Sequence, residues 1–201
     1  MPADVVVYGF DTSNNFKVRI ALGYKGIAHE FRSIDPGDRS EILRLSGQHL
    51  TPVLVHDGRV LFDSAAILRY LDANFPETPK LFGRDRAEQW EIEDWELFAR
   101  TDLAGPMMEV IHTRASGGTV NDAGQRRCAA AFGAAVTRLV HHMEGREWMV
   151  GDRMTAADIT PAAVLFRIRA AEVLPVPAAA EQLTGWERRV MEWDGKHREN
   201  E

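Results

Sequence analysis

The segment from Thr51 to Leu71 combines residue types that suit a small extended ligand. Its sequence, TPVLVHDGRVLFDSAAILRYL, opens on a threonine-proline pair and places an acidic-serine pair before a helical apolar pattern. Proline has no N–H to donate, so Pro52 at a strand entry leaves neighbouring main-chain groups free for a ligand. A helix that begins after Asp63 and Ser64 would attract a carboxylate to its N-terminus. The segment therefore predicts a pocket for a small peptide, with Thr51 facing it.

The middle of this segment predicts a β-hairpin. Asp57-Gly58 separates two runs rich in valine and leucine, and an Asp-Gly pair readily adopts the positive φ angles of a type I′ turn. We expect paired strands over Val53–His56 and Arg59–Phe62. We also expect a cis peptide bond before Pro52, because that geometry turns the main chain of Thr51 toward the pocket.

A second group of polar side chains lies in the segment FDTSNNFKV, residues 10–18. Thr12, Ser13 and Asn14 stand where a helix should begin, and they supply hydroxyl and amide donors. A thiol whose sulfur lies above a helix N-terminus ionises more easily, because the helix dipole and nearby donors both favour the thiolate. We therefore expect the reacting centre to lie in this segment. Equally, one of these residues must serve as an N-cap, which every helix requires.

The pattern of predicted secondary structure differs between the two halves of the chain. From Val5 to Ala73 the order strand, helix, strand, helix, hairpin, helix is typical of a thioredoxin-like domain. FPETPKLFG, residues 75–83, reads as a linker, and after Arg84 the pattern is helical. We predict a domain over 1–76, a linker over 77–84, a helical domain over 85–193 and a polar tail over 194–201.

Composition excludes several classes of function. The chain has 201 residues, a formal net charge of −6 and a pI near 5.7, which argues against nucleic acid or an anionic membrane as the main partner. No signal peptide or membrane-spanning run is visible, so the expected location is cytoplasmic. A single cysteine, Cys128, excludes an intramolecular disulfide and is expected to be buried in a helix. The seven histidines lack metal-binding spacing, so we expect no metal.

These motifs resemble the soluble glutathione transferase superfamily. Thr51-Pro52-Val53 is similar to that family's cis-proline segment, and Asp63-Ser64 is similar to its acidic-serine motif. The resemblance extends from about Val5 to about Trp193. Thr12, Asn14, Lys17 and Val18 match a Thr-x-Asn-x-x-Lys-Val pattern that resembles the bacterial Nu-class enzymes. Serine-type classes would instead place the activating hydroxyl at Thr12 or Ser13, so the choice between these two residues stays open.

The resemblance implies an α/β thioredoxin-like N-terminal domain followed by an all-α helical bundle. It implies glutathione as co-substrate and a small electrophile as second substrate, with peroxide reduction as a close variant, and a two-fold homodimer. A non-enzymatic binding or regulatory protein of the same fold is the alternative.

The implied site residues fall into three groups. Thr12, Ser13 and Asn14 would activate the thiol. The residues implied to bind glutathione are Gln48, His49, Thr51, Pro52, Val53, Asp63 and Ser64. Those expected to line the electrophile pocket are Phe10, Trp95, Phe98, Asp102 and Met107.

Three further patterns predict structure. Thr155 and Asp158 form a capping box that should start a helix. Gly105-Pro106 should kink or end the helix that precedes it. Trp186 and Trp193, seven residues apart, are expected to share one buried helical face.

Overall fold

A computed structural model describes residues 4–195, and the chain divides into two compact units. The first unit comprises residues 4–82 together with 192–195, and the second comprises residues 83–191. Most of the predicted polar tail, residues 196–201, lies outside the described residues. The predicted boundaries at 76, 84 and 193 stay predictions.

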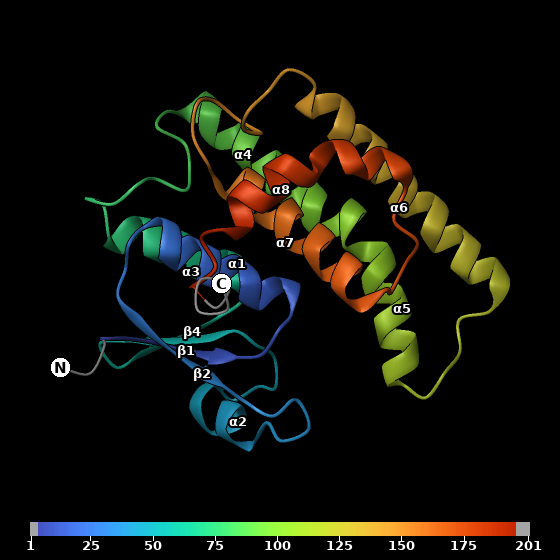
Figure 1. Cartoon of the computed structure of the whole chain (residues 1–201). Helices are drawn as coiled ribbons and strands as arrows, with labels where there is room; N and C mark the ends of the chain where they lie inside the picture. Colours follow the sequence, from blue (N-terminus) through green and yellow to red (C-terminus); the bar gives the residue numbers. More distant parts are fainter. Residues whose placement is uncertain (1–3, 196–201) are drawn as a thin grey trace. The chain divides into compact units, whose positions relative to one another are not determined.

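The first unit is a mixed sheet covered by helices. Its elements, in chain order, are β1 (Val5–Gly9), α1 (Ser13–Tyr24), β2 (His29–Ser33), α2 (Ser40–Ser46), β3 (Val53–His56), β4 (Arg59–Phe62) and α3 (Ser64–Asn74). The strand order is β2-β1-β3-β4, in which only β1 and β2 run parallel. Helices α1 and α3 cover one face of the sheet and α2 lies on the other (Figure 1). The predicted thioredoxin-like order is confirmed.

The hairpin forms as its turn residues predict. Asp57 and Gly58 have φ angles of 49° and 73°, and β3 and β4 pair antiparallel with Val55 opposite Val60. Both strands have the expected bounds. The Thr51–Pro52 peptide bond is cis, as expected. Thr51 therefore lies two residues before the start of β3, and Asp63 lies directly after β4.

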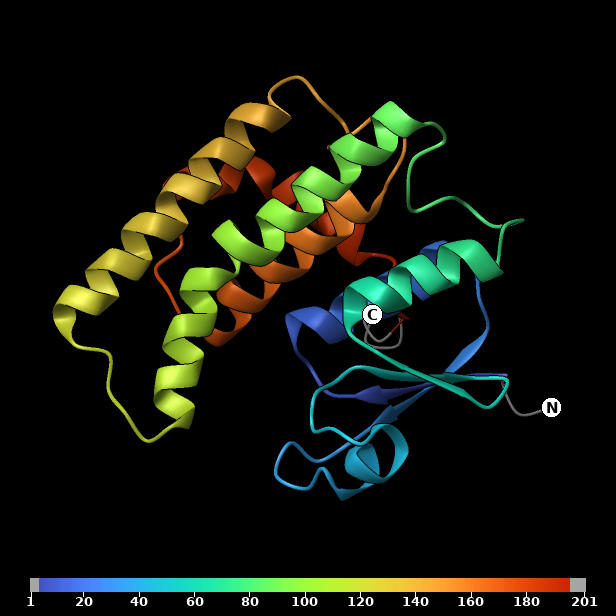
Figure 2. The ribbon, with the colours of Figure 1, turned by 180° about the vertical axis from the view of Figure 1, so that it is seen from behind.

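The second unit is helical throughout its described elements. They are α4 (Arg86–Phe98), the π-helix η1 (Ala99–Leu103), α5 (Gly105–Ala115), α6 (Asp122–Met143), α7 (Ala156–Ala171), the 3₁₀-helix η2 (Ala178–Leu183) and α8 (Thr184–Met191). Figure 2 shows α4 continuing through η1 into α5 along one bent path, with α6 beside α5. The break at Gly105-Pro106 is confirmed, because α5 begins there with proline in its first turn. Cys128 is buried in α6, as expected.

A buried carboxylate starts α7. Thr155 and Asp158 form the predicted capping box, and Asp158 also accepts hydrogen bonds from the Met149 N–H (2.8 Å) and the Trp186 ring N–H (3.0 Å). Burial raises the pKa of Asp158 to about 6, although these donors and those of Thr155 lower it. The box therefore joins α7 to the preceding loop and to α8.

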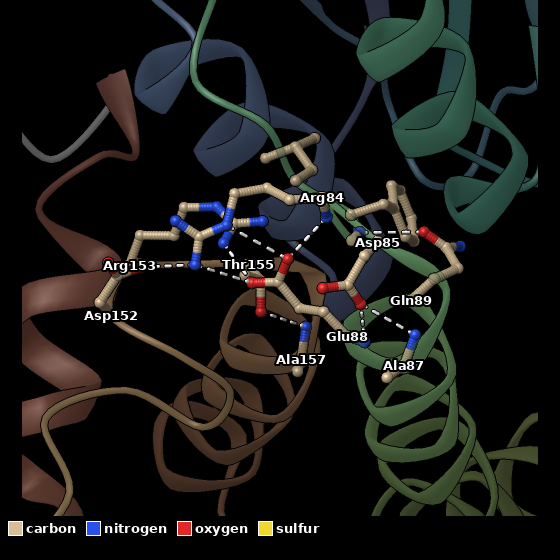
Figure 3. Close-up of polar contacts among 12 residues, drawn as sticks. Arg84, Asp85, Ala87, Glu88, Gln89, Asp152, Arg153, Thr155 and Ala157 are labelled. Atoms are coloured by element: carbon tan, nitrogen blue, oxygen red, sulfur yellow. Dashed lines mark hydrogen bonds and ion pairs between the residues drawn. The ribbon is translucent and has the colours of Figure 1, made fainter.

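An ion network joins the start of α4 to the loop before α7 (Figure 3). Glu88 accepts from the guanidinium of Arg153, and from the main-chain N–H and side chain of Arg84. Arg84 also donates to Asp152, at 2.9 Å. Burial opposes ionisation of Glu88, but the hydrogen bonds from Arg153 and Arg84 outweigh it and lower its pKa to about 2.

The end of the described chain belongs to the first unit. The Arg19 guanidinium donates to both oxygens of Asp194, at 2.8 and 2.6 Å, and to Asp11 at 2.9 Å. The ring of Trp193 meets Tyr24 edge-on, with centroids 5.3 Å apart. The prediction that Trp186 and Trp193 share a helical face is wrong, because α8 ends at Met191 and only Trp186 lies on it.

Candidate functional site

The start of α1 is built around the hydroxyl of Thr12. Thr12 has an extended backbone, with φ −133°, and is the N-cap of the helix: its Oγ1 accepts from the Asn15 N–H at 3.3 Å. The side chain of Asn15 adds two hydrogen bonds, because its Nδ2 donates to Oγ1 of Thr12 (2.7 Å) and to Oγ1 of Thr51 (2.9 Å). The predicted thiol-activating residue and the residue before the cis-proline therefore share one amide.

A further hydrogen bond joins the starts of α1 and α3. The Ser64 hydroxyl donates to Oδ1 of Asn14 at 3.2 Å, although the two residues are 50 positions apart in the chain. Ser64 and Ser13 are buried, at 6% and 8% exposure, while Asn14 is exposed. Two helix N-termini and the cis-proline segment thus converge, and each carries polar side chains that sequence analysis singled out.

Asp63 caps α3 in an unusual backbone conformation. Its carboxylate accepts from the N–H groups of Ala65 (2.9 Å) and Ala66 (3.0 Å), and its φ is +69°. A non-glycine residue in this region is strained and is retained when the surrounding structure demands it. Asp63 is the single residue between the end of β4 at Phe62 and the start of α3 at Ser64.

Hydrogen bonds within the loop before Thr51 hold it together. Nε2 of Gln48 donates to the Ser46 hydroxyl (2.8 Å) and to the Leu50 carbonyl (2.9 Å), and the Leu50 N–H donates back to Gln48. His49 is exposed, and its carbonyl accepts from Arg39 at 2.9 Å. The Gln48 amide therefore holds the loop in shape, and its predicted contact with glutathione stays a prediction. Val53, the first residue of β3, pairs with Tyr8 of β1 and Phe62 of β4.

The residues predicted to line an electrophile pocket have different surroundings. Phe10, in the first unit, is partly buried and has the Arg39 guanidinium 4.9 Å from its ring centre. In the second unit, Trp95 and Phe98 are 8% and 4% exposed and meet edge-to-face. The Arg138 guanidinium lies over both of those rings, at 4.9 and 4.5 Å.

Of the other two predicted pocket residues, Met107 is 1% exposed and Asp102 is exposed. Asp102 lines a cavity of about 450 Å³ in the second unit. The other lining residues are Thr101, Gly105, Pro106, Glu109, Arg127, Cys128 and Ala131. The grouping of the five predicted residues into one electrophile pocket stays a prediction.

Sequence profiles of a known family match both units of the chain. The glutathione S-transferase N-terminal domain matches residues 7–79, and the glutathione S-transferase C-terminal domain matches residues 105–194. The chain belongs to the soluble glutathione S-transferase superfamily. The start of α1, the cis-proline and the Asp63-Ser64 pair all lie within the range matched by the N-terminal domain of this family.

Individual relatives and solved structures agree with this membership. Glutathione S-transferase U10 of Arabidopsis thaliana is 32% identical over 110 residues, which are 53% of this chain and 47% of that protein. The chain thus spans about half the length of this curated relative. The crystal structure of beta-etherase LigF from Sphingobium sp. strain SYK-6 superposes with a TM-score of 0.84 at 18% identity and covers 98% of this chain and 100% of that one.

A third comparison comes from a structure that contains a glutathione derivative. The glutathione S-transferase mrad2831_1084 from Methylobacterium radiotolerans JCM 2831, in complex with glutathione sulfonate, has a TM-score of 0.74 at 20% identity. The superposition covers 96% of this chain and 90% of the Methylobacterium radiotolerans chain. At these identities the two solved structures show that this superfamily member has the glutathione transferase fold.

Two further observations on this glutathione S-transferase homologue concern metal ions and membranes. Within residues 4–195, no three histidine, cysteine, aspartate or glutamate side chains are grouped closely enough to hold a metal ion. No helix in the described part is long and apolar enough to span a membrane.

Sequence reasoning missed Asn15. An asparagine one position after Asn14 looks like an ordinary helix residue, and its contact with Thr51 joins residues 36 positions apart. The one available sign was a second consecutive amide at a helix start, which by itself predicts nothing specific.

Proposed function

We propose that this protein is a glutathione-dependent transferase that adds the thiolate of bound glutathione to a small electrophile. The observation that supports this most is the convergence of Thr12, Asn14, Thr51 and Ser64 through the amide of Asn15 and the Ser64–Asn14 hydrogen bond. Family membership supports glutathione as the ligand of this site.

The two ends of glutathione would meet different parts of the site. The N-terminus of α3, with Ser64 in its first turn, suits the α-carboxylate of the γ-glutamyl group. The main chain of Thr51, beside the cis-proline, suits the extended peptide. Gln48 and His49 would lie toward the glycine end.

The sulfur would then lie at the start of α1. The helix dipole and the Thr12 hydroxyl both favour the ionised thiol, and an ionised acceptor strengthens the hydrogen bond it receives. Binding and orientation of the thiolate lower the barrier to nucleophilic attack. Thr12 is our choice of donor, with Ser13 as its rival and Asn14 beside it.

We further propose that the protein works as a homodimer. Trp90 and Leu97 lie seven residues apart on α4 and are 63% and 54% exposed. Two large apolar side chains on one helical face suit a subunit interface. A cytoplasmic location is part of the same proposal.

A panel of electrophiles and peroxides, assayed with glutathione, tests the proposed reaction. We expect thioether formation with at least one alkyl, aryl or conjugated electrophile, or reduction of an organic peroxide. Calorimetry with glutathione runs in parallel. Binding of glutathione without turnover on any electrophile or peroxide would contradict the proposed transferase. Absence of binding would favour the non-enzymatic alternative, because such a protein need not retain glutathione.

A further inference from the structure

We propose that Asn15 is a positioning residue that turns the Thr12 hydroxyl outward as a hydrogen-bond donor to the sulfur of bound glutathione. This inference rests on the proposed function, because it concerns how that site activates a thiol. Asn15 is 0% exposed, and its side chain donates hydrogen bonds to the hydroxyls of Thr12 and Thr51. Its proposed role is to orient these hydroxyls without contacting the substrate.

The argument begins with the bonding capacity of a hydroxyl group. A threonine hydroxyl has two acceptor lone pairs and one proton to donate. Oγ1 of Thr12 accepts from the main-chain N–H of Asn15 at 3.3 Å and from its Nδ2 at 2.7 Å. Both lone pairs are therefore engaged by Asn15, and the hydroxyl proton must point away from it.

The same contacts make that proton a better donor. A hydroxyl that already accepts hydrogen bonds is polarised, and chains of such bonds strengthen one another. The proton of Thr12 is most valuable when it meets an anion, because a charge-assisted hydrogen bond is stronger than a neutral one. Asn15 therefore favours the thiolate over the thiol through Thr12.

The side chain of Asn15 is confined to this orientation. A Cβ at Gly9, at the end of β1, would lie 1.7 Å from its Oδ1, so glycine at that position makes room for the amide. Oδ1 itself has no hydrogen-bond partner among residues 4–195. A buried polar atom without a partner costs stability, so an amide retained there at that cost points to a role other than stability.

Asn15 also sets Thr12 relative to the peptide-binding segment. The second hydrogen of Nδ2 is used by Thr51, at 2.9 Å, directly before the cis-proline. One rigid amide thus fixes the thiol donor and the segment that would hold the main chain of glutathione. Because the amide contacts the side chain of Thr51 and not the main chain that would bind glutathione, its loss is expected to affect thiol ionisation more than glutathione affinity.

The test measures the pKa of glutathione's thiol in the complex, from thiolate absorbance against pH. Asn15→Leu keeps the size of the side chain and removes both donors, and we expect the bound thiol pKa to rise by about half a unit to one unit. Asn15→Asp replaces the donor by an acceptor that draws the Thr12 proton inward, so we expect a larger rise, of about one to two units. Both should lower kcat and leave KM for glutathione within about twofold.

Asn74→Asp is the matched control, because it makes the same chemical change at the end of α3, where the native amide donates to the Tyr70 carbonyl. We expect the thiol pKa of this variant to equal the wild-type value. If Asn15→Leu does not fold at the assay temperature, Asn15→Ser, which is smaller than the native residue, carries the same measurement.

A double-mutant cycle with Thr12→Val separates positioning from a general structural effect. If Asn15 acts through Thr12, Asn15→Leu should add almost nothing to the pKa shift of Thr12→Val. Additive shifts would overturn the inference. So would a bound thiol pKa that stays constant or falls in Asn15→Leu, since a fall would mean that the native amide holds the Thr12 proton inward.

The outcomes also distinguish this inference from the proposed function. A wild-type protein that binds glutathione with a lowered thiol pKa, together with silent Asn15 variants, would overturn the inference alone. A wild-type protein that binds no glutathione would overturn the proposed function and this inference together.

Discussion

At the scale of single residues, the candidate site is a set of donors placed at two helix starts. Thr12 caps α1, and Ser64 occupies the first position of α3 and reaches Asn14. A hydroxyl at a helix N-terminus adds a directed hydrogen bond to the general attraction that the helix dipole exerts on an anion. Under the proposed function, the start of α3 would hold the carboxylate end of glutathione and the start of α1 its sulfur.

Ser64→Ala should weaken glutathione binding. The substitution removes a donor to a charged group, worth about 1.5 to 3 kcal/mol, which corresponds to a loss in affinity of roughly tenfold or more. Calorimetry with glutathione measures the change. Ser116→Ala is the control, because that hydroxyl donates to the His112 carbonyl at the end of α5. Equal affinities in the two variants would remove Ser64 from the site.

At the scale of elements, the buried capping box of α7 joins the start of that helix to neighbouring segments through the hydrogen bonds of Asp158. Asp158→Ala would leave the N–H groups of Met149, Thr155 and Trp186 without their acceptor, at about 1 to 3 kcal/mol for each buried donor. We expect the free energy of unfolding to fall by at least about 3 kcal/mol. Urea denaturation measures it.

The control for this prediction is Asp85→Ala at the start of α4. Asp85 is an exposed N-cap that accepts from the Ala87 and Glu88 N–H groups. Loss of such a cap costs about 1 kcal/mol. A similar cost for Asp158→Ala and Asp85→Ala would show that burial of the Asp158 network adds nothing.

The network at Glu88 predicts a loss of stability in acid. Its pKa is about 2 in the folded protein, below the ordinary value of 4.5. A lowered folded pKa gives stability that is fully present above pH 4.5 and is lost as the pH falls toward 2. Between these values, the stability of the wild type should fall more steeply than that of Glu88→Gln. Parallel curves of unfolding free energy against pH would exclude this contribution.

The sequence allowed the prediction of elements whose signals are local. The Asp57-Gly58 turn, both hairpin strands and the Thr155–Asp158 box depend on residues within a few positions of one another. The Trp193 prediction failed because a seven-residue spacing carries no information on where α8 ends. Asn15 was missed because its partner Thr51 is brought near only by the complete sheet.

At the scale of the whole molecule, the described end of the chain completes the first unit. Asp194 is fully buried beside Arg19, which also lies 5.0 and 4.8 Å from the rings of Phe16 and Phe31. A Cβ at Gly23 would lie 2.0 Å from the Trp193 carbonyl oxygen, so α1 has a glycine where this segment passes. The first unit is therefore incomplete without residues from the far end of the sequence.

Asp194→Ala should destabilise the protein strongly. It removes the carboxylate that two Arg19 nitrogens contact and leaves a buried guanidinium poorly compensated, which costs about 3 to 5 kcal/mol. Asp11→Ala is the control, because Asp11 meets the same guanidinium but its side chain is 58% exposed, and such a partner is worth about 1 kcal/mol or less. Chemical denaturation that ranks the two variants in the opposite order would contradict this reading of the C-terminal segment.

The most direct test of the whole account is the pKa of the thiol of glutathione bound to the wild-type protein and to Thr12→Val and Ser13→Ala. Thiolate absorbance against pH should show a wild-type pKa below that of free glutathione. Thr12→Val should raise it by about one to two units, the equivalent of one hydrogen bond to an anion, and Ser13→Ala should change it less. A bound thiol that titrates like free glutathione, or a shift that depends on Ser13 and not on Thr12, would contradict the account.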